Sequence, residues 1–150
     1  SALLSLFQDY NEAKKEYVAL CIGNMKAKSG VIKENLTQHG QEKSAITNYK
    51  VEKEWKKSYL IDDVQTEIGF SKIRLILEAG RMHQIRIHLA KQGCPIAGDD
   101  QHGNFKINKL LKKHFKVKRF LLASVRLTIP IENKECVFEI ENPFRELEVY

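Results

Sequence analysis

The 150-residue sequence has few of the features that mark specialised protein classes. Its three cysteines, Cys21, Cys94 and Cys136, are odd in number and far apart, so they indicate neither a disulfide framework nor a zinc site. No apolar run reaches the roughly 18 residues that a membrane-spanning helix needs. The first residues lack the basic and long apolar segments of a signal peptide. We therefore expect reduced thiols, no membrane association and a cytoplasmic location.

The motifs of several enzyme classes are also absent. The sequence contains no P-loop, no dinucleotide-binding fingerprint and no G-x-S-x-G nucleophile elbow. His83 and His88 are five residues apart rather than four, so their spacing does not favour a shared metal ion. Cys94 lacks the flanking residues of a cysteine protease. Gly98-Asp99-Asp100 resembles a catalytic acidic pair, but adjacent carboxylates beside glycine are more typical of a turn or helix cap.

The sequence does contain an excess of positive charge. Lysine and arginine number 25 against 19 acidic residues, which gives a formal charge of +6. This balance leaves a nucleic-acid partner open. Residues 106–116 place apolar side chains on one helical face and lysines on the other. The lysine face is typical of a solvated helix, although as a cluster it modestly favours contact with RNA or DNA.

Periodicity and turn residues predict an α+β fold with a mixed, mostly antiparallel sheet and flanking helices. Alternating side chains predict strands at residues 16–22, 45–52, 59–68, 71–79, 120–129 and 135–141. Helical spacing predicts helices at residues 1–15, 82–92 and 106–116. Gly69-Phe70 is the expected hairpin turn between the third and fourth strands, and Gly93 the expected cap of the second helix. We expect residues 23–44 to be rich in loops, with room for short strands, and residues 94–105 to form a loop.

The strongest functional signal is residues 80–89, with the sequence G-R-M-H-Q-I-R-I-H-L. Two arginines, two histidines and a glutamine lie there at a strand-to-helix junction, where free backbone N–H groups favour anions. A solvated helix face is the alternative interpretation. The position of the glycine between a strand and a helix start favours a ligand site.

Residues 78–99 closely resemble the signature of the RluA-type pseudouridine synthases, G-R-T-H-Q-I-R-V-H followed by G-x-P-I-x-G-D, with Met82 at the usual threonine. Weaker similarities follow in the same order along the chain. Residues 15–19 resemble the family's K-x-Y-x-A strand, and 44–49 its A-x-T-x-Y segment. Residues 120–127 resemble its L-H-A-x-x-L strand, and 138–143 its ending.

The resemblance implies isomerisation of uridine to pseudouridine in structured RNA, ribosomal or transfer RNA, with no cofactor and no metal. It implies that Tyr17 is the active-site tyrosine that stacks on the flipped base. It implies that Arg81 is the arginine that pairs with the catalytic aspartate. The remaining motif residues are expected to bind RNA: Lys15, His83, Gln84, Arg86 and His88.

One part of the family pattern is absent. The catalytic aspartate of the family lies in an H-R-L-D motif ahead of the K-x-Y strand, and these 150 residues contain no such motif. We therefore expect residues 1–150 to be the C-terminal part of a synthase catalytic domain that is inactive as given. An incomplete sheet should expose strand edges and favour self-association. The alternative is a non-catalytic RNA-binding module with the same fold.

Overall fold

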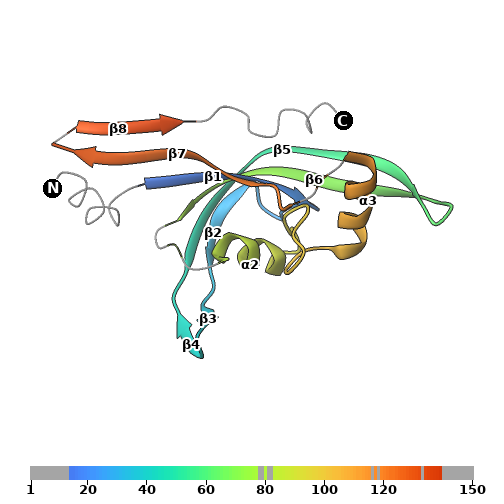
Figure 1. Ribbon diagram of the computed structural model, residues 1–150, viewed down its shortest axis with the longest axis horizontal. Helices are drawn as coiled ribbons and strands as arrows, with labels where there is room; N and C mark the ends of the chain where they lie inside the picture. The colour runs from blue at the N-terminus through green and yellow to red at the C-terminus, as the bar shows by residue number, and fades with distance from the viewer. Residues whose placement is uncertain are drawn as a thin grey trace.

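The computed structural model describes residues 14–77, 80, 83–115, 117, 119–132 and 134–139. Its main element is a six-stranded sheet in the order β2-β5-β6-β1-β7-β8, in which every neighbouring pair is antiparallel (Figure 1). Two helices pack on this sheet, and β3 and β4 form a separate small hairpin that projects from it. The expected α+β fold class is confirmed.

The bounds of the elements are as follows. The strands are β1 Lys14–Ile22, β2 Ser29–Lys33, β3 Leu36–Gln38, β4 Gln41–Lys43, β5 Ile46–Ile61, β6 Val64–Leu77, β7 Leu122–Ile131 and β8 Lys134–Glu139. The helices are α2 Gln84–Lys91 and α3 Phe105–Phe115. The expected helix at residues 1–15 falls almost entirely outside the described residues.

The sheet carries an apolar cluster on each of its faces. Ile73 and Leu75 of β6 belong to one cluster with the α2 residue Leu89, whereas Ile68 and Phe70 belong to the other. Since successive side chains of a strand point to opposite faces, these two sets lie on opposite sides of the sheet. Helix α2 therefore covers one face, and α3 packs against the other.

The long hairpin of β5 and β6 differs from the expected one. The sequence predicts a turn at Gly69-Phe70, but both residues lie within β6, and β5 continues through residues 53–58. The turn is at Asp62 and Asp63, which both have positive φ, 49° and 63°. Aspartate adopts this left-handed conformation more readily than most residues, and two such residues in succession suit a two-residue hairpin loop.

Gly69 is within a strand because the neighbouring backbone approaches it closely. Its carbonyl oxygen accepts a 2.7 Å hydrogen bond from the Gly23 N–H, and a Cβ at this position would collide with the Asn24 side chain. A glycine inside a strand often marks such a close approach. The prediction of a turn here was wrong because close packing by another segment, not chain reversal, requires this glycine.

The expected second and third helices are confirmed to within two residues. Helix α2 ends in a Schellman motif, in which the Cys94 N–H donates to Leu89 O and the Gly93 N–H donates to Ala90 O. Gly93 has the positive φ that this cap requires, 74°. Within the described part of the chain, no helix is long and apolar enough to cross a membrane.

Candidate functional site

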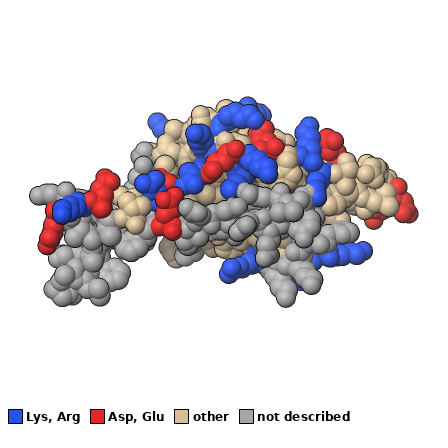
Figure 2. All heavy atoms as spheres, turned by 90° about the horizontal axis from the view of Figure 1, so that it is seen from above, with Lys and Arg blue, Asp and Glu red and all other residues tan. Residues whose placement is uncertain are grey.

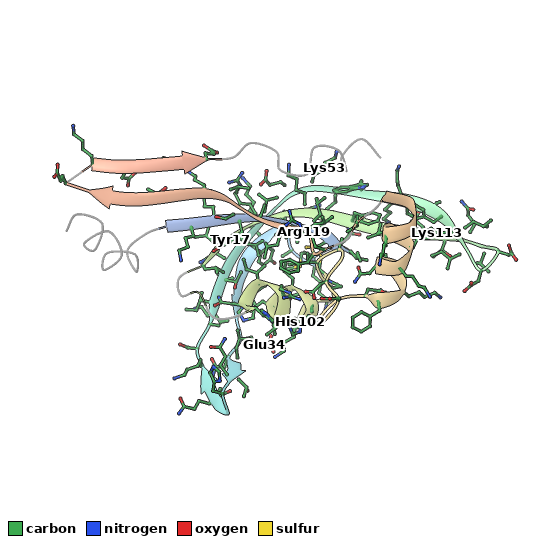
Figure 3. The ribbon with its side chains drawn as sticks, in the orientation of Figure 1. Tyr17, Glu34, Lys53, His102, Lys113 and Arg119 are labelled. Carbon is green, nitrogen blue, oxygen red and sulfur yellow. The ribbon has the colours of Figure 1, made fainter. Side chains whose placement is uncertain are left out.

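A hollow of about 270 Å³ lies where the N-terminal end of α2 meets the sheet. Six of its lining residues are Tyr17 of β1, Leu77 of β6, His83 and Arg86 at α2, and Phe120 and Leu122 at the start of β7. Figure 3 shows Tyr17 in the central part of the sheet. The hollow is slightly smaller than typical small-molecule sites. It therefore brings together Tyr17 and part of the 80–89 segment, as the sequence predicts.

Arg86 forms a buried, bidentate ion pair within the site. Its Nε donates to Asp99 Oδ2 at 2.9 Å, and its Nη2 donates to Asp99 Oδ1 at 2.7 Å. Arg86 is only 7% exposed and Asp99 is fully buried. The guanidinium carbon also lies 4.3 Å from the centre of the Phe120 ring, a cation–π contact. The cation that lines the hollow is thus fixed on two sides.

Hydrogen bonding has a larger effect than desolvation on the pKa of Asp99 in this ion pair. Burial alone raises the pKa of Asp99, but hydrogen bonds from Arg86 and from the backbone N–H groups of His102 and Gln101 lower the pKa to about 2. In turn, the hydrogen bonds to Asp99 raise the pKa of Arg86 above its ordinary value. Both groups are therefore charged throughout the neutral range.

Asp99 also joins three segments of the chain. Its Oδ1 accepts the Gln101 and His102 N–H groups, each at 3.0 Å, which closes the turn that the sequence predicts at Gly98-Asp99-Asp100. Its backbone carbonyl accepts a 2.7 Å hydrogen bond from the Asn108 side chain of α3. The turn was expected, whereas the ion pair to Arg86 was not. Asp99 thus connects α2, the loop and the start of α3.

Gln84 and His88 are buried in a polar network between α2 and β5. Gln84 Nε2 donates to Ile46 O and to Thr47 Oγ1, each at 3.0 Å. His88 contacts Thr47 Oγ1 through Nδ1 and Glu34 O through Nε2, each at 2.8 Å. A neutral ring with its proton on Nε2 satisfies both contacts of His88. Their expected role in RNA binding stays a prediction; in this structure both side chains contact protein groups.

The other motif residues differ in their placement. His83 is half-buried, has a left-handed φ of 56°, and its Nδ1 lies 3.3 Å from Nε2 of His102 (Figure 3). Lys15 is half-buried on β1, two residues from Tyr17 and therefore on the same face of the strand. Arg81 lies outside the described residues. Among the described residues, the structure thus brings Arg86 to the same hollow as Tyr17.

A second hollow, of about 560 Å³, lies between the β5–β6 hairpin and the start of α3. Its lining includes Asp62 and Glu67 and none of the motif residues. Within the described ranges, no three histidine, cysteine or acidic side chains are close enough to hold a metal ion. The smaller hollow is therefore the better candidate site.

The sequence analysis does not identify Phe120 as a lining residue, nor the contacts of Arg86 with Phe120 and Asp99. Phe120 was assigned only to a strand, and Arg86 only to RNA contact. A signal for their pairing was present, because arginine favours aromatic faces and buried carboxylates. The sequence does not identify which of Arg81 and Arg86 would form a buried ion pair, or with which carboxylate.

Comparisons with known proteins identify relatives over most of the chain. A family model described as RNA pseudouridylate synthase matches residues 1–91. Ribosomal large subunit pseudouridine synthase D of Blochmanniella floridana is 27% identical in an alignment of 146 residues, which covers 90% of this chain and 40% of that protein. tRNA pseudouridine synthase C of Vibrio vulnificus is 33% identical over 107 residues, 70% of this chain and 43% of that protein. The chain thus spans less than half the length of these curated relatives.

A solved structure has a similar fold. Human RNA Pseudouridylate Synthase Domain Containing 1 superposes with a TM-score of 0.70 at 22% identity, covering 95% of this chain and 61% of that one. At this level of identity the similarity establishes the fold. The sheet and its two helices are therefore an arrangement that a known domain shares.

We expect the Asp99→Asn substitution to lower the free energy of unfolding by about 3–5 kcal/mol at neutral pH, because Arg86 would remain buried without its counter-charge. Urea unfolding, followed by the fluorescence of Trp55, the single tryptophan, would measure the change. Asp100→Asn is the matched control, since the Asp100 side chain is 87% exposed and lies 3.7 Å from Arg86. Its effect should stay within about 0.5 kcal/mol.

The same variants test the pH dependence. The pKa of Asp99 is about 2 in the folded protein, below the reference value of 3.8, so its stabilisation is complete above about pH 4. It should decrease as the pH falls from about 4 towards 2, by up to about 2 kcal/mol in total. The Asp99→Asn variant should not show this loss of stability at acid pH. Parallel acid profiles for the variant and the parent protein would contradict the assignment.

Proposed function

Because the chain belongs to the RNA pseudouridylate synthase family, as an RluA-type member, we propose that it forms part of an enzyme that converts uridine to pseudouridine in RNA. The observation that carries the proposal is the hollow that Tyr17 and Arg86 share with the motif residues His83 and Gln84. The names of the relatives support ribosomal or transfer RNA as the substrate. Their names and the resemblance support the substrate class, not a particular uridine.

The proposed reaction is an isomerisation that conserves all atoms. The bond between the ribose C1′ and uracil N1 breaks, the detached uracil turns, and a new bond forms from C1′ to C5. The proton on C5 leaves and N1 gains one. Tyr17 would stack on the flipped base, and the cation of the hollow would orient the carboxylate that acts on the ribose.

We propose that Arg86 is the cation that orients this carboxylate. Its Nη1 has no hydrogen bond to any described residue, whereas Nε and Nη2 are held by Asp99. The two N–H groups of Nη1 thus remain for a further carboxylate. Arg81, which the resemblance implies for this pairing and which precedes α2 by three residues in the sequence, remains a second proposed cation.

The described residues do not provide that carboxylate to the hollow. Among the described lining residues there is no aspartate or glutamate. Asp99 is fully buried and occupied by Arg86, so it cannot reach a ribose. We therefore propose that these residues alone are inactive and correspond to the C-terminal part of a catalytic domain.

Tritium release from RNA labelled at uridine C5 tests this proposal. We expect no release from the 150-residue chain, and release when the chain is extended by coding sequence ahead of Ser1 that supplies the family aspartate. Release by the 150 residues alone would contradict their proposed inactivity. No release from an extended chain that carries the aspartate would overturn the proposed activity.

A non-catalytic RNA-binding module is the second candidate function. The lack of a carboxylate among the described lining residues, together with the net charge of +6, favours it. An upstream coding sequence in which the aspartate is replaced would support this module. It would remove the catalytic assignments of Tyr17 and both arginines.

The stacking role of Tyr17 predicts a selective loss of affinity. Tyr17→Leu should weaken binding to a uridine-containing stem-loop RNA about 5- to 150-fold, since stacking of one base contributes about 1–3 kcal/mol. Tyr17→Phe should bind nearly as well as the parent protein because it keeps the ring. Fluorescence anisotropy would measure the affinities, with Tyr59→Leu as the control. If the Tyr17→Leu variant binds the RNA with unchanged affinity, Tyr17 does not stack on an RNA base.

We also propose a cytoplasmic location, which the buried free thiols Cys21 and Cys94 support. Self-association through a sheet edge is proposed as well. Among the described strands, β8 pairs with β7 alone, and Val137 on it is 43% exposed. An edge strand with an exposed apolar side chain can pair with a second chain.

Light scattering tests the proposed self-association. We expect a mass above that of one chain, and a shift towards the monomer for Val137→Lys, because a charge on an edge strand opposes pairing. Lys134→Gln, at the other end of the same strand, is the control. A monomer at all concentrations of the parent protein would contradict the proposal.

A further inference from the structure

Helix α3 has a basic face that the proposed reaction does not use. Its apolar side chains Ile107, Leu110 and Leu111 pack into the cluster on one face of the sheet. The opposite arc, about 120° wide at 100° per residue, holds four exposed lysines. They are Lys106, Lys109, Lys112 and Lys113, here called the α3 lysine face. From the first to the last, the face extends about 10 Å along the helix axis.

This arrangement is unfavourable for the helix itself. Lys109 lies three residues from Lys106 and Lys112 and four from Lys113, and like charges at these spacings repel. Lys106 is also in the first turn, where the helix dipole disfavours a cation, and the helix contains no acidic residue. Interactions within the helix therefore oppose this distribution of charge.

The rest of the described chain does not balance these charges. None of the four ammonium groups forms an ion pair with a residue that the structure describes. By contrast, three lysines elsewhere meet carboxylates: Lys28 pairs with Glu54, Lys56 with Glu67 and Lys91 with Glu34. The α3 lysine face thus presents its charge outwards, and an anion outside the described chain would relieve its repulsion.

The chemistry of the face fits a phosphate backbone. A protein interface has a desolvated centre of several aromatic or apolar side chains, whereas Phe105 is the one described residue of α3 that is both apolar and exposed. Ammonium groups spaced along about 10 Å match a polymer that carries several phosphates over that length. Phe105, 62% exposed beside Lys106, adds a ring on which an unpaired base could stack.

The position of α3 separates this contact from the hollow. Figure 3 shows Lys113 near one end of the sheet, away from Tyr17. Figure 2 shows lysine and arginine side chains gathered over the middle of the visible face, with acidic side chains both among them and at its outer ends. An RNA that reaches both Tyr17 and α3 would therefore extend well beyond one nucleotide.

We propose that the α3 lysine face binds the phosphate backbone of the substrate RNA at a distance from the target uridine. This inference rests on the proposed function, since it takes RNA as the ligand. It assigns to α3 a contribution to affinity that is independent of base identity. Binding at the hollow would select the nucleotide, and binding at α3 would hold the strands that flank it.

The salt dependence of RNA binding tests the inference. Lys106, Lys109 and Lys113 would be changed together to glutamine, which keeps helix propensity and removes three charges. The affinity for a uridine-containing stem-loop RNA would be measured by anisotropy over a range of salt concentrations. Each phosphate contact contributes about 0.7–0.9 to the slope of log K against log salt, so we expect the slope to fall by about 2–3.

The matched control removes the same charge elsewhere. Changing Lys28, Lys56 and Lys91 to glutamine lowers the net charge by three but removes lysines already paired with glutamates. This variant should keep the parent slope to within about 1. A triple change of the α3 lysines to arginine should also keep the slope. Circular dichroism would verify that each variant retains its helices.

The outcomes separate this inference from the proposed function. If the parent chain binds RNA and the α3 variant keeps its slope, the inference is wrong and the proposed function stands. If the slope of log K against log salt decreases equally in the α3 variant and in the control, net charge explains the effect and the inference is also wrong. If the parent chain does not bind RNA, both this inference and an RNA-binding role of the chain are overturned.

Discussion

The buried ion pair between Arg86 and Asp99 is the interaction on which the site depends. Each partner would be costly to bury alone, and the bidentate geometry, with the two backbone N–H groups at Asp99, compensates for the desolvation. Asp99 also anchors Asn108 of α3 through its carbonyl oxygen. One carboxylate thereby fixes the cation of the hollow, the loop after α2 and the start of the helix that carries the lysine face.

A second polar network fixes the other side of α2. Gln84 and His88 both meet Thr47 of β5, and each makes a further hydrogen bond to a backbone carbonyl. Two polar side chains of the motif therefore help to place a helix. They face inward because Thr47 Oγ1 and the backbone carbonyls of Ile46 and Glu34 are fixed hydrogen-bond partners.

The sequence is sufficient to predict the fold class, both described helices and the strands at residues 16–22 and 120–129. These patterns are local, so periodicity detects them. The long β5–β6 hairpin was misplaced because Gly69 is required by the approach of Gly23 and Asn24, which are distant in sequence. In the candidate site, Tyr17 and three polar residues of the motif line one hollow, while their roles stay predictions. Which motif side chains would be buried depends on partners such as Thr47 and Asp99, and no spacing rule identifies them.

The ion pair also constrains the proposed reaction. Asp99 already balances the charge of Arg86, so an incoming catalytic carboxylate would meet a guanidinium whose field is partly cancelled. It would also lie near the negative charge of Asp99, and a like charge at short range raises the pKa of a carboxyl group. An ionised nucleophile at neutral pH therefore needs another cation near the hollow. Lys15, on the same face of β1 as Tyr17, is a described motif residue suited to this role, and Arg81, three residues before α2 in the sequence, is a second candidate. Arg86 would then act through Nη1, which has no hydrogen bond to a described residue.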